Sequence, residues 1–181
     1  KGTSAPPVFY RDSGSFSKAG ASPDAPMMFV ASDETADRLG DVIVAAGWSL
    51  DNFKQNPVFM LAHDHAGLPI GRADVRVEGR QLLASVQFDT ADPVSVAVRG
   101  KYERGFMKAV SVGFRAIETE DIIGQDGKRL GLMFKKTELL ELSAVAVPAH
   151  PSALMRRALE RRIAEGASPT GEERRAEATE S

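Results

Sequence analysis

Two segments of the chain alternate between apolar and small or polar residues, and this period of two is the feature that most constrains the fold. One segment has its apolar positions at Leu82, Ala84, Val86 and Phe88. The other has them at Val110, Val112, Phe114 and Ala116. Successive side chains of a β-strand point to opposite faces, so both segments are predicted to be half-buried strands of a mainly antiparallel sheet.

Three further apolar runs predict additional strands. They cover residues 27–31, 58–62 and 139–147. The last run is almost continuously apolar, which is typical of a strand that is covered on both faces. The strand signals outnumber the helix signals, and we therefore expect a mainly β domain with peripheral helices (α+β), closed into an antiparallel barrel.

Helices are predicted at two main places. Residues 93–104 follow Asp92, a favourable N-cap, and have Pro93 at the first helical position. Residues 152–164 carry an apolar stripe on one face and arginines on the other. A shorter helix is expected at residues 42–46.

The two ends of the chain differ in composition from the middle. Residues 1–26 are rich in Ser, Gly, Ala and Pro and predict a flexible N-terminal arm, because they contain little apolar surface to offset the entropy of ordering. Residues 166–181 are charged and lack large apolar side chains, which predicts a C-terminal tail. Residues 27–165 are then one compact domain.

Composition excludes several classes of protein. The chain has no cysteine, which rules out disulfide scaffolds, cysteine nucleophiles and thiolate zinc sites. Its net charge of −2 argues against a nucleic-acid partner. No apolar run approaches the roughly 18 residues that span a bilayer, and no apolar signal segment follows Lys1. We expect a cytosolic protein with no membrane partner.

The chain has only three histidines, at positions 63, 65 and 150. His63 and His65 follow an apolar run, and on an extended backbone residues two apart point the same way. Both imidazoles are therefore expected to face one site. The alternative is a polar surface turn at the end of a strand.

Ser111 is a candidate nucleophile in the second alternating segment. Its side chain is expected on the face of Gly113 and Arg115, opposite the apolar face. Glycine two residues away leaves space beside the hydroxyl, which a nucleophile needs. Structural serines in strands are nevertheless far more common than catalytic ones.

Glu141 is the least expected residue, because it lies inside the apolar run of residues 139–147. A buried carboxylate without a partner costs several kcal/mol, so it requires a hydrogen-bond donor. A histidine is one candidate, and a structural salt bridge to an arginine is the other, with Arg72, Arg99 and Arg115 as options. Glu138, three positions earlier, is expected on the opposite face.

Ser111, His63 and Glu141 together have the chemistry of a catalytic triad. A serine hydroxyl is a weak nucleophile until an imidazole accepts its proton. The imidazole works best when an acid sets its tautomer and stabilises its charged form.

Three motifs, in order and spacing over about residues 27–164, resemble the prohead proteases of tailed bacteriophages. The first comprises Asn-Pro-Val at residues 56–58, His63-Asp64, and Pro-Ile-Gly at residues 69–71. The second is a small apolar pair, Ser111, an aliphatic residue, glycine and an aromatic residue. The third covers residues 138–151 and has His150 where the family usually has Asn.

The resemblance implies a serine endopeptidase that acts inside the assembling procapsid in the cytoplasm of a bacterial host. Its substrates would be the major capsid protein's scaffolding segment or a separate scaffold protein, and commonly itself. Ser111 and His63 would be catalytic, without a cofactor. By motif position Glu141 would be the third member, with His150 and Asp64 as competitors. The resemblance also implies the barrel of herpesvirus assembly proteases, whose third member is a histidine, and pairing as a homodimer through a helix.

Three alternatives remain open. His63 and His65, with Asp64 or His150, resemble the ligands of a metal hydrolase, but the usual barrel for such a site needs roughly 250 residues. The α/β-hydrolase nucleophile elbow requires a strand, a sharp turn and a helix, whereas the strand alternation continues past Ser111. A non-enzymatic capsid-assembly or scaffold protein on the same fold is the third alternative.

Overall fold

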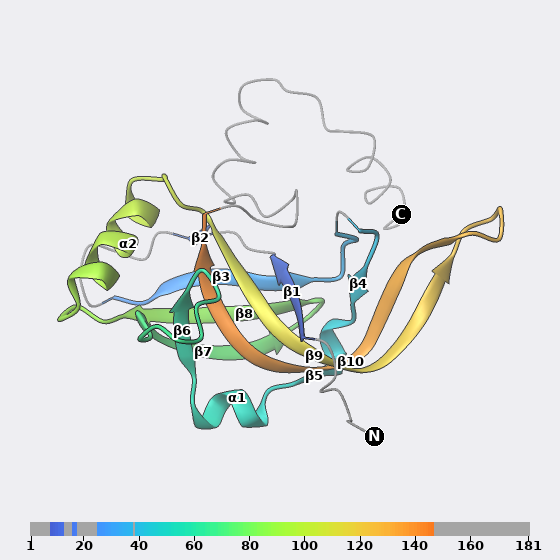
Figure 1. Cartoon of the computed structure of the whole chain (residues 1–181), viewed down its shortest axis with the longest axis horizontal. Coiled ribbons are helices and arrows are strands. Elements are labelled where there is room, and N and C mark those ends of the chain that lie inside the picture. Colours follow the sequence, from blue (N-terminus) through green and yellow to red (C-terminus); the bar gives the residue numbers. More distant parts are fainter. Residues whose placement is uncertain (1–7, 13–15, 18–24, 38, 147–181) are drawn as a thin grey trace.

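The computed structural model describes residues 8–12, 16–17, 25–37 and 39–146, and one curved sheet contains most of them (Figure 1). Its strands are β1 (Val8–Asp12), β2 (Phe16–Ser17), β3 (Met27–Asp33), β4 (Val42–Ile43), β5 (Trp48–Ser49), β6 (Val58–Leu61), β7 (Gly71–Glu78), β8 (Gln81–Phe88), β9 (Ala109–Ile123) and β10 (Arg129–Val145). The helices are the 3₁₀ turn η1 (Ala45–Gly47), α1 (Asp51–Gln55) and α2 (Pro93–Glu103).

The strand order makes the sheet a nearly closed barrel. Along the sheet the order is β1-β9-β10-β6-β7-β8-β3-β2, and β4 and β5 also pair with β10. β3, from one end of this path, contacts β9 near the other end. Most pairs are antiparallel, but β4, β5 and β6 all run parallel to β10. The far part of the β9–β10 hairpin extends away from the barrel (Figure 1).

The mainly β fold class is confirmed, and β3, β8 and β9 contain their predicted strands. β6 and β10 end at Leu61 and Val145, one and two residues before the predicted ends. In β8 every second residue is buried, as its alternation predicts. The helix predicted at residues 93–104 is confirmed as α2, where the Asp92 carboxylate accepts hydrogen bonds from the N–H groups of Val94 (3.0 Å) and Ser95 (3.1 Å).

The helix expected at residues 42–46 is confirmed only in part, because residues 42–43 pair with β10 and the helical turn begins at Ala45. The segment forms β4 and then the turn η1, and the Val44 N–H donates to the Phe134 carbonyl at 3.0 Å. A Cβ at Gly47 would lie 1.9 Å from the Lys135 carbonyl oxygen, so only glycine permits this close approach. Pairing with a distant strand has overridden local helix preference.

Two predictions concern parts of the chain that the structure describes incompletely or not at all. Residues 152–164 lie outside the described residues. Within residues 1–26, the expected arm, the described parts include β1, which pairs with β9, and β2, which pairs with β3. The division into arm, domain and tail stays a prediction. No helix among the residues that the structure describes is long and apolar enough to cross a membrane.

The main hydrophobic core fills the barrel, and α2 packs into it through the buried Val98 and Tyr102. Edge-to-face aromatic pairs join different elements within the core, with ring centroids 5.3 Å apart for Phe29 and Tyr102 and 5.5 Å apart for Phe59 and Phe88. The buried Tyr102 hydroxyl donates to the Ala109 carbonyl at 2.7 Å, which ties α2 to the first residue of β9.

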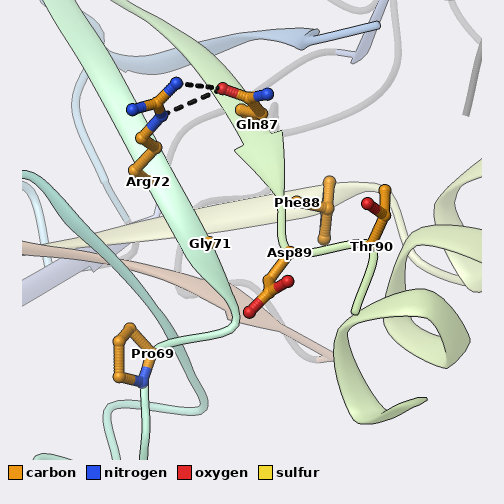
Figure 2. Close-up of a pocket in the computed structure, with 7 residues that line it drawn as sticks. All are labelled: Pro69, Gly71, Arg72, Gln87, Phe88, Asp89 and Thr90. Carbon is orange, nitrogen blue, oxygen red and sulfur yellow. Dashed lines mark hydrogen bonds between the residues drawn. The ribbon is translucent and has the colours of Figure 1, made fainter. Parts of the chain in front are cut away.

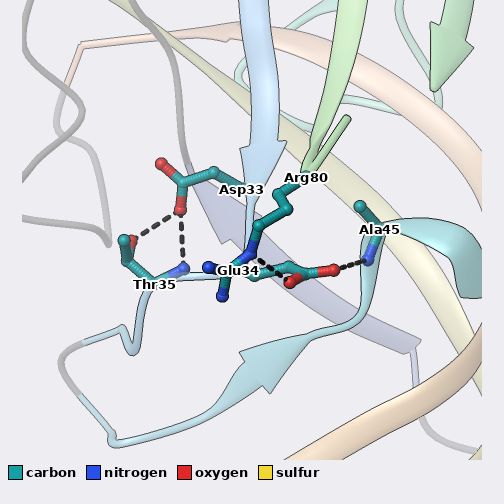
Figure 3. A network of polar contacts seen from close by, with 5 residues as sticks. All are labelled: Asp33, Glu34, Thr35, Ala45 and Arg80. Carbon is teal, nitrogen blue, oxygen red and sulfur yellow. Dashed lines mark hydrogen bonds and ion pairs between the residues drawn. The ribbon is translucent and has the colours of Figure 1, made fainter. Parts of the chain in front are cut away.

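A polar network joins the end of β3 to η1 and to the turn between β7 and β8 (Figure 3). The Glu34 carboxylate accepts hydrogen bonds from the Ala45 N–H at 2.9 Å and the Arg80 Nε at 2.7 Å. Burial alone would raise the pKa of Glu34, but these two partners outweigh burial and hold that pKa below its ordinary value.

Replacing Tyr102 with Phe is expected to lower the free energy of unfolding by about 1–2 kcal/mol, because the buried Ala109 carbonyl loses its donor while the ring remains. Urea titration measures the difference. The slope of unfolding free energy against urea should stay unchanged, since the surface exposed on unfolding is the same. A variant as stable as the wild type would contradict the assigned role of this hydrogen bond.

Replacing Glu34 with Gln should destabilise the protein at neutral pH and have little effect in acid. A carboxylate whose folded pKa is depressed contributes stability above its unfolded pKa, and that stability is lost as the pH falls through the folded pKa. Melting temperatures of the two proteins at pH 7 and below about pH 4 test this. Glu78→Gln, at an exposed ion pair, is the control and should change little at either pH.

Candidate active site

His63 follows the end of β6, where the chain makes an unusual turn. The Ala62 N–H still donates to the Ala144 carbonyl of β10 at 2.9 Å, so the turn stays beside that strand. Ala62 and His63 then have φ angles of 53° and 59°, in the left-handed region. Residues other than glycine adopt this conformation at a cost of about 1–3 kcal/mol, and such strain clusters at functional sites.

The His63 ring meets a buried carboxylate. Its Nδ1 lies 2.6 Å from Oε1 of Glu141, which is only 4% exposed. The Ser143 hydroxyl donates to Oε2 of Glu141 at 2.5 Å. Ser143 Oγ also accepts the His63 backbone N–H at 3.3 Å. The hydrogen-bond donor that a buried Glu141 requires is therefore supplied by His63 and Ser143.

Ser111 lies on β9, directly beside this group. In the antiparallel β9–β10 register Ser111 is opposite Ser143, and Gly113 is opposite Glu141. Paired residues share a face of a sheet, so all four are on the face opposite Val112 and its core neighbours. The structure thus places Ser111 one strand from Ser143, whose hydroxyl contacts His63. Ser111 itself is completely buried.

The expectation that Glu138 and Glu141 lie on opposite faces is wrong because the ladder contains a β-bulge. The register shifts between Leu139 and Glu141, with Leu140 as the extra residue. Glu138 therefore pairs with Arg115 and faces the same side as Glu141. It forms an ion pair with Arg115 and accepts a hydrogen bond from Nδ2 of Asn52 at 2.6 Å.

The three arginines considered as partners of Glu141 are engaged elsewhere. Arg72 donates to the Gln87 side chain at 2.9 and 2.6 Å. Arg99 contacts Glu103 at 2.9 Å and the Ala25 carbonyl at 2.9 Å, and Arg115 pairs with Glu138. The salt-bridge alternative for Glu141 is accordingly wrong.

Gly113 does leave space, but the Glu141 side chain occupies it. A Cβ added at Gly113 would lie 2.6 Å from Oε1 and 2.8 Å from Cγ of Glu141. The expected gap beside the serine is thus the space over Gly113 that the Glu141 carboxylate occupies while it contacts His63. A side chain at position 113 would force Glu141 to move.

The other candidate residues of the histidine motif have different environments. The expectation that His65 faces the same site as His63 rested on an extended backbone, which the left-handed turn contradicts, and His65 is exposed. Asp64 is exposed and holds this turn by accepting the N–H groups of Ala66 (3.1 Å) and Gly67 (3.2 Å). His150 lies outside the described residues. Within the described ranges, no three His, Cys, Asp or Glu residues gather as metal ligands.

The Pro-Ile-Gly part of the motif has a structural role. Ile70 is buried, its N–H donates to the Phe59 carbonyl at 2.8 Å, and its carbonyl accepts the Ser95 hydroxyl at 2.5 Å. A Cβ at Gly71 would lie 2.3 Å from the Gln87 carbonyl oxygen. Figure 2 shows Pro69 and Gly71 lining a pocket beside the end of β8. This segment fixes the chain that returns from the His63 turn to the barrel.

Sequence reasoning missed Ser143 and the purpose of Gly113. The signal for Ser143 was present, because a residue two positions after Glu141 in a strand faces the same side. The contact between Gly113 and Glu141 was not readable, since it depends on the pairing register of two strands and on the bulge at Leu140.

Two phage proteins are similar to this chain in sequence. The chain is 30% identical to the prohead protease of Escherichia phage T5 over 118 residues, 63% of this chain and 53% of that protein. It is 32% identical to the capsid polyprotein of Pseudomonas phage PAJU2 over 131 residues, 68% of this chain and 18% of the polyprotein. The chain thus spans about half of the first relative and less of the second.

The fold also resembles a solved structure, that of the bacteriophage T4 capsid assembly protease. The match covers 80% of this chain and 100% of the other, with a TM-score of 0.57 and 11% sequence identity, which indicates a shared fold. The model of one protein family, the caudovirus prohead serine protease, matches residues 27–168. Since this match covers most of the sequence, the chain belongs to the caudovirus prohead serine protease family.

Proposed function

We propose that this chain is a serine endopeptidase of phage head maturation, with Ser111 as nucleophile, His63 as general base and Glu141 as the acid that orients His63. The observation that carries the proposal is the 2.6 Å contact between His63 Nδ1 and the buried Glu141 carboxylate, beside the paired Ser111 and Ser143. Membership of the prohead protease family supports the same reaction.

The mechanism follows from the protonation of the imidazole. With the proton on Nδ1 donated to Glu141, Nε2 is the basic nitrogen. Nε2 accepts the Ser111 proton as Oγ attacks the scissile carbonyl, and His63 then protonates the leaving amine. Water, activated by the same base, hydrolyses the acyl-enzyme. The neighbouring carboxylate stabilises the imidazolium in both steps.

The substrates we propose are the major capsid protein's scaffolding segment or a separate scaffold protein, together with the chain itself. The relatives named prohead protease and capsid assembly protease support this class of substrate. Cleavage would take place inside the procapsid, in the bacterial cytoplasm, by a homodimer and without a cofactor. We also propose that the barrel is of the herpesvirus assembly-protease type, with Glu141 where that type has histidine.

The complete burial of Ser111 favours a second candidate function, that of a non-enzymatic assembly or scaffold protein. A peptide can reach this hydroxyl only after the groups that cover it are displaced. A protein that never makes this movement would be a non-enzymatic assembly or scaffold protein on the same fold. The two functions differ in whether Ser111 reacts.

Replacing Ser111 with Ala is expected to reduce cleavage of a co-expressed capsid or scaffold protein by at least about 10³-fold, because the acyl-enzyme can no longer form. A serine-reactive phosphonate should label the wild type at Ser111 and leave the variant unlabelled. Ser32→Ala, at a buried strand serine of β3, is the matched control and should retain activity. Unchanged processing by Ser111→Ala, with assembly retained, would establish the scaffold function instead.

Replacing Gly113 with Ala should lower kcat on the order of 10²-fold, because the added methyl group displaces Glu141 from His63. Gly100→Ala is the control, since its Cβ meets only the flexible end of the Arg104 side chain, and it should keep wild-type kcat. Thermal unfolding of both variants separates loss of the site from loss of the fold. Wild-type activity of Gly113→Ala would contradict the proposed role of Glu141.

A further inference from the structure

We propose that Ser143 is a positioning residue that holds both the Glu141 carboxylate and the His63 backbone in the geometry required for catalysis. Ser143 lies inside the third sequence motif, which assigned it no role. The inference rests on the proposed function, because the geometry that Ser143 holds is that of the proposed base and its orienting acid.

Three hydrogen bonds make a closed ring through Ser143. Its hydroxyl donates to Oε2 of Glu141 at 2.5 Å and accepts the His63 N–H at 3.3 Å, while His63 Nδ1 contacts Oε1 at 2.6 Å. A hydroxyl has one proton and two lone pairs, so one serine can be donor and acceptor at once. The imidazole of His63 is therefore held by Glu141, and the His63 backbone is held by Ser143, which is itself bonded to Glu141.

This ring accounts for two costly features of the site. Glu141 is a buried carboxylate, and a second donor on Oε2 offsets the loss of water at the oxygen that His63 does not reach. His63 has a left-handed backbone, which persists only when neighbouring groups hold it. The contact from its N–H to Ser143 is one such restraint, made at the strained residue itself.

The same contacts distinguish Ser143 from the nucleophile. A nucleophilic serine must give its proton to the imidazole, whereas the Ser143 proton is already donated to Glu141. Ser111 is directly opposite Ser143 in the register, where Cβ atoms of paired residues lie about 4.5–5.5 Å apart. The two buried serines therefore lie side by side with different proposed roles. Ser111 is the nucleophile, and Ser143 acts through Glu141 and His63.

The test compares Ser143→Ala with the wild type and with Ser32→Ala in the full chain. Ser32 is also buried in a strand, and its hydroxyl has no hydrogen-bond partner among the described residues. For a peptide substrate, kcat of Ser143→Ala should fall about 10- to 100-fold, the loss expected for one hydrogen bond to a charged group, while KM stays within about twofold. Phosphonate labelling should slow but still occur at Ser111. Ser32→Ala should match the wild type.

A second readout requires no turnover. The Nδ1 proton of ¹⁵N-labelled His63, which donates to Glu141, should give a downfield NMR resonance that shifts and broadens in Ser143→Ala and stays unchanged in Ser32→Ala. If the alanine variant does not fold, Ser143→Cys retains a weak donor of similar size and should give an intermediate loss.

Each outcome has one meaning. An unchanged kcat and an unchanged resonance in Ser143→Ala would overturn the positioning role. Loss of all phosphonate labelling in Ser143→Ala, with labelling retained in Ser111→Ala, would instead make Ser143 the nucleophile and overturn the proposal. A wild type that neither cleaves nor reacts would refute the proposed function, and the resonance would then still report whether Ser143 positions His63 against Glu141.

Discussion

A negatively charged carboxylate in the middle of a barrel strand, shielded from water, is the constraint on which the rest of the site depends. Glu141 is stable there only because donors are brought to both of its oxygens. One donor is the ring of a histidine that follows a different strand, and the other is a serine two residues along the same strand. The contact from His63 both satisfies the buried carboxylate and fixes the tautomer of the proposed base. The same hydrogen bond therefore serves the stability of Glu141 and the proposed chemistry.

The strand β10 is the element that makes this arrangement possible. It pairs antiparallel with β9, which carries Ser111, and parallel with β6, which leads into His63. Two chain segments that are far apart in the sequence thus reach the same strand from opposite sides. The bulge at Leu140 then sets which of its acidic residues faces which partner: Glu138 meets Arg115, and Glu141 meets the gap over Gly113. Without the bulge, Glu138 and Glu141 would face opposite sides of the sheet.

Much of the fold was predictable because the signals are local. Alternation over residues 82–88 and 110–116 depends only on the pleat of a strand, and the cap formed by Asp92 depends on its own first turn. The short strands β4 and β5 and the helix α1 were not predicted. Residues 42–46 have no strong pattern of their own, and their conformation is set by pairing with β10, almost a hundred residues later.

The sequence by itself determined the candidate residues: a serine on the non-core face of a strand, a histidine where an apolar run ends, and a glutamate in an apolar run that must find a donor. Only the tertiary structure decided the hydrogen-bond partners of Glu141. They are His63, rather than an arginine, and Ser143 as the second donor. The physical reason is that each residue's type is a property of its position in the chain. Its partner, by contrast, depends on strand register, on a single bulge and on a left-handed turn, and these follow from how the whole barrel closes.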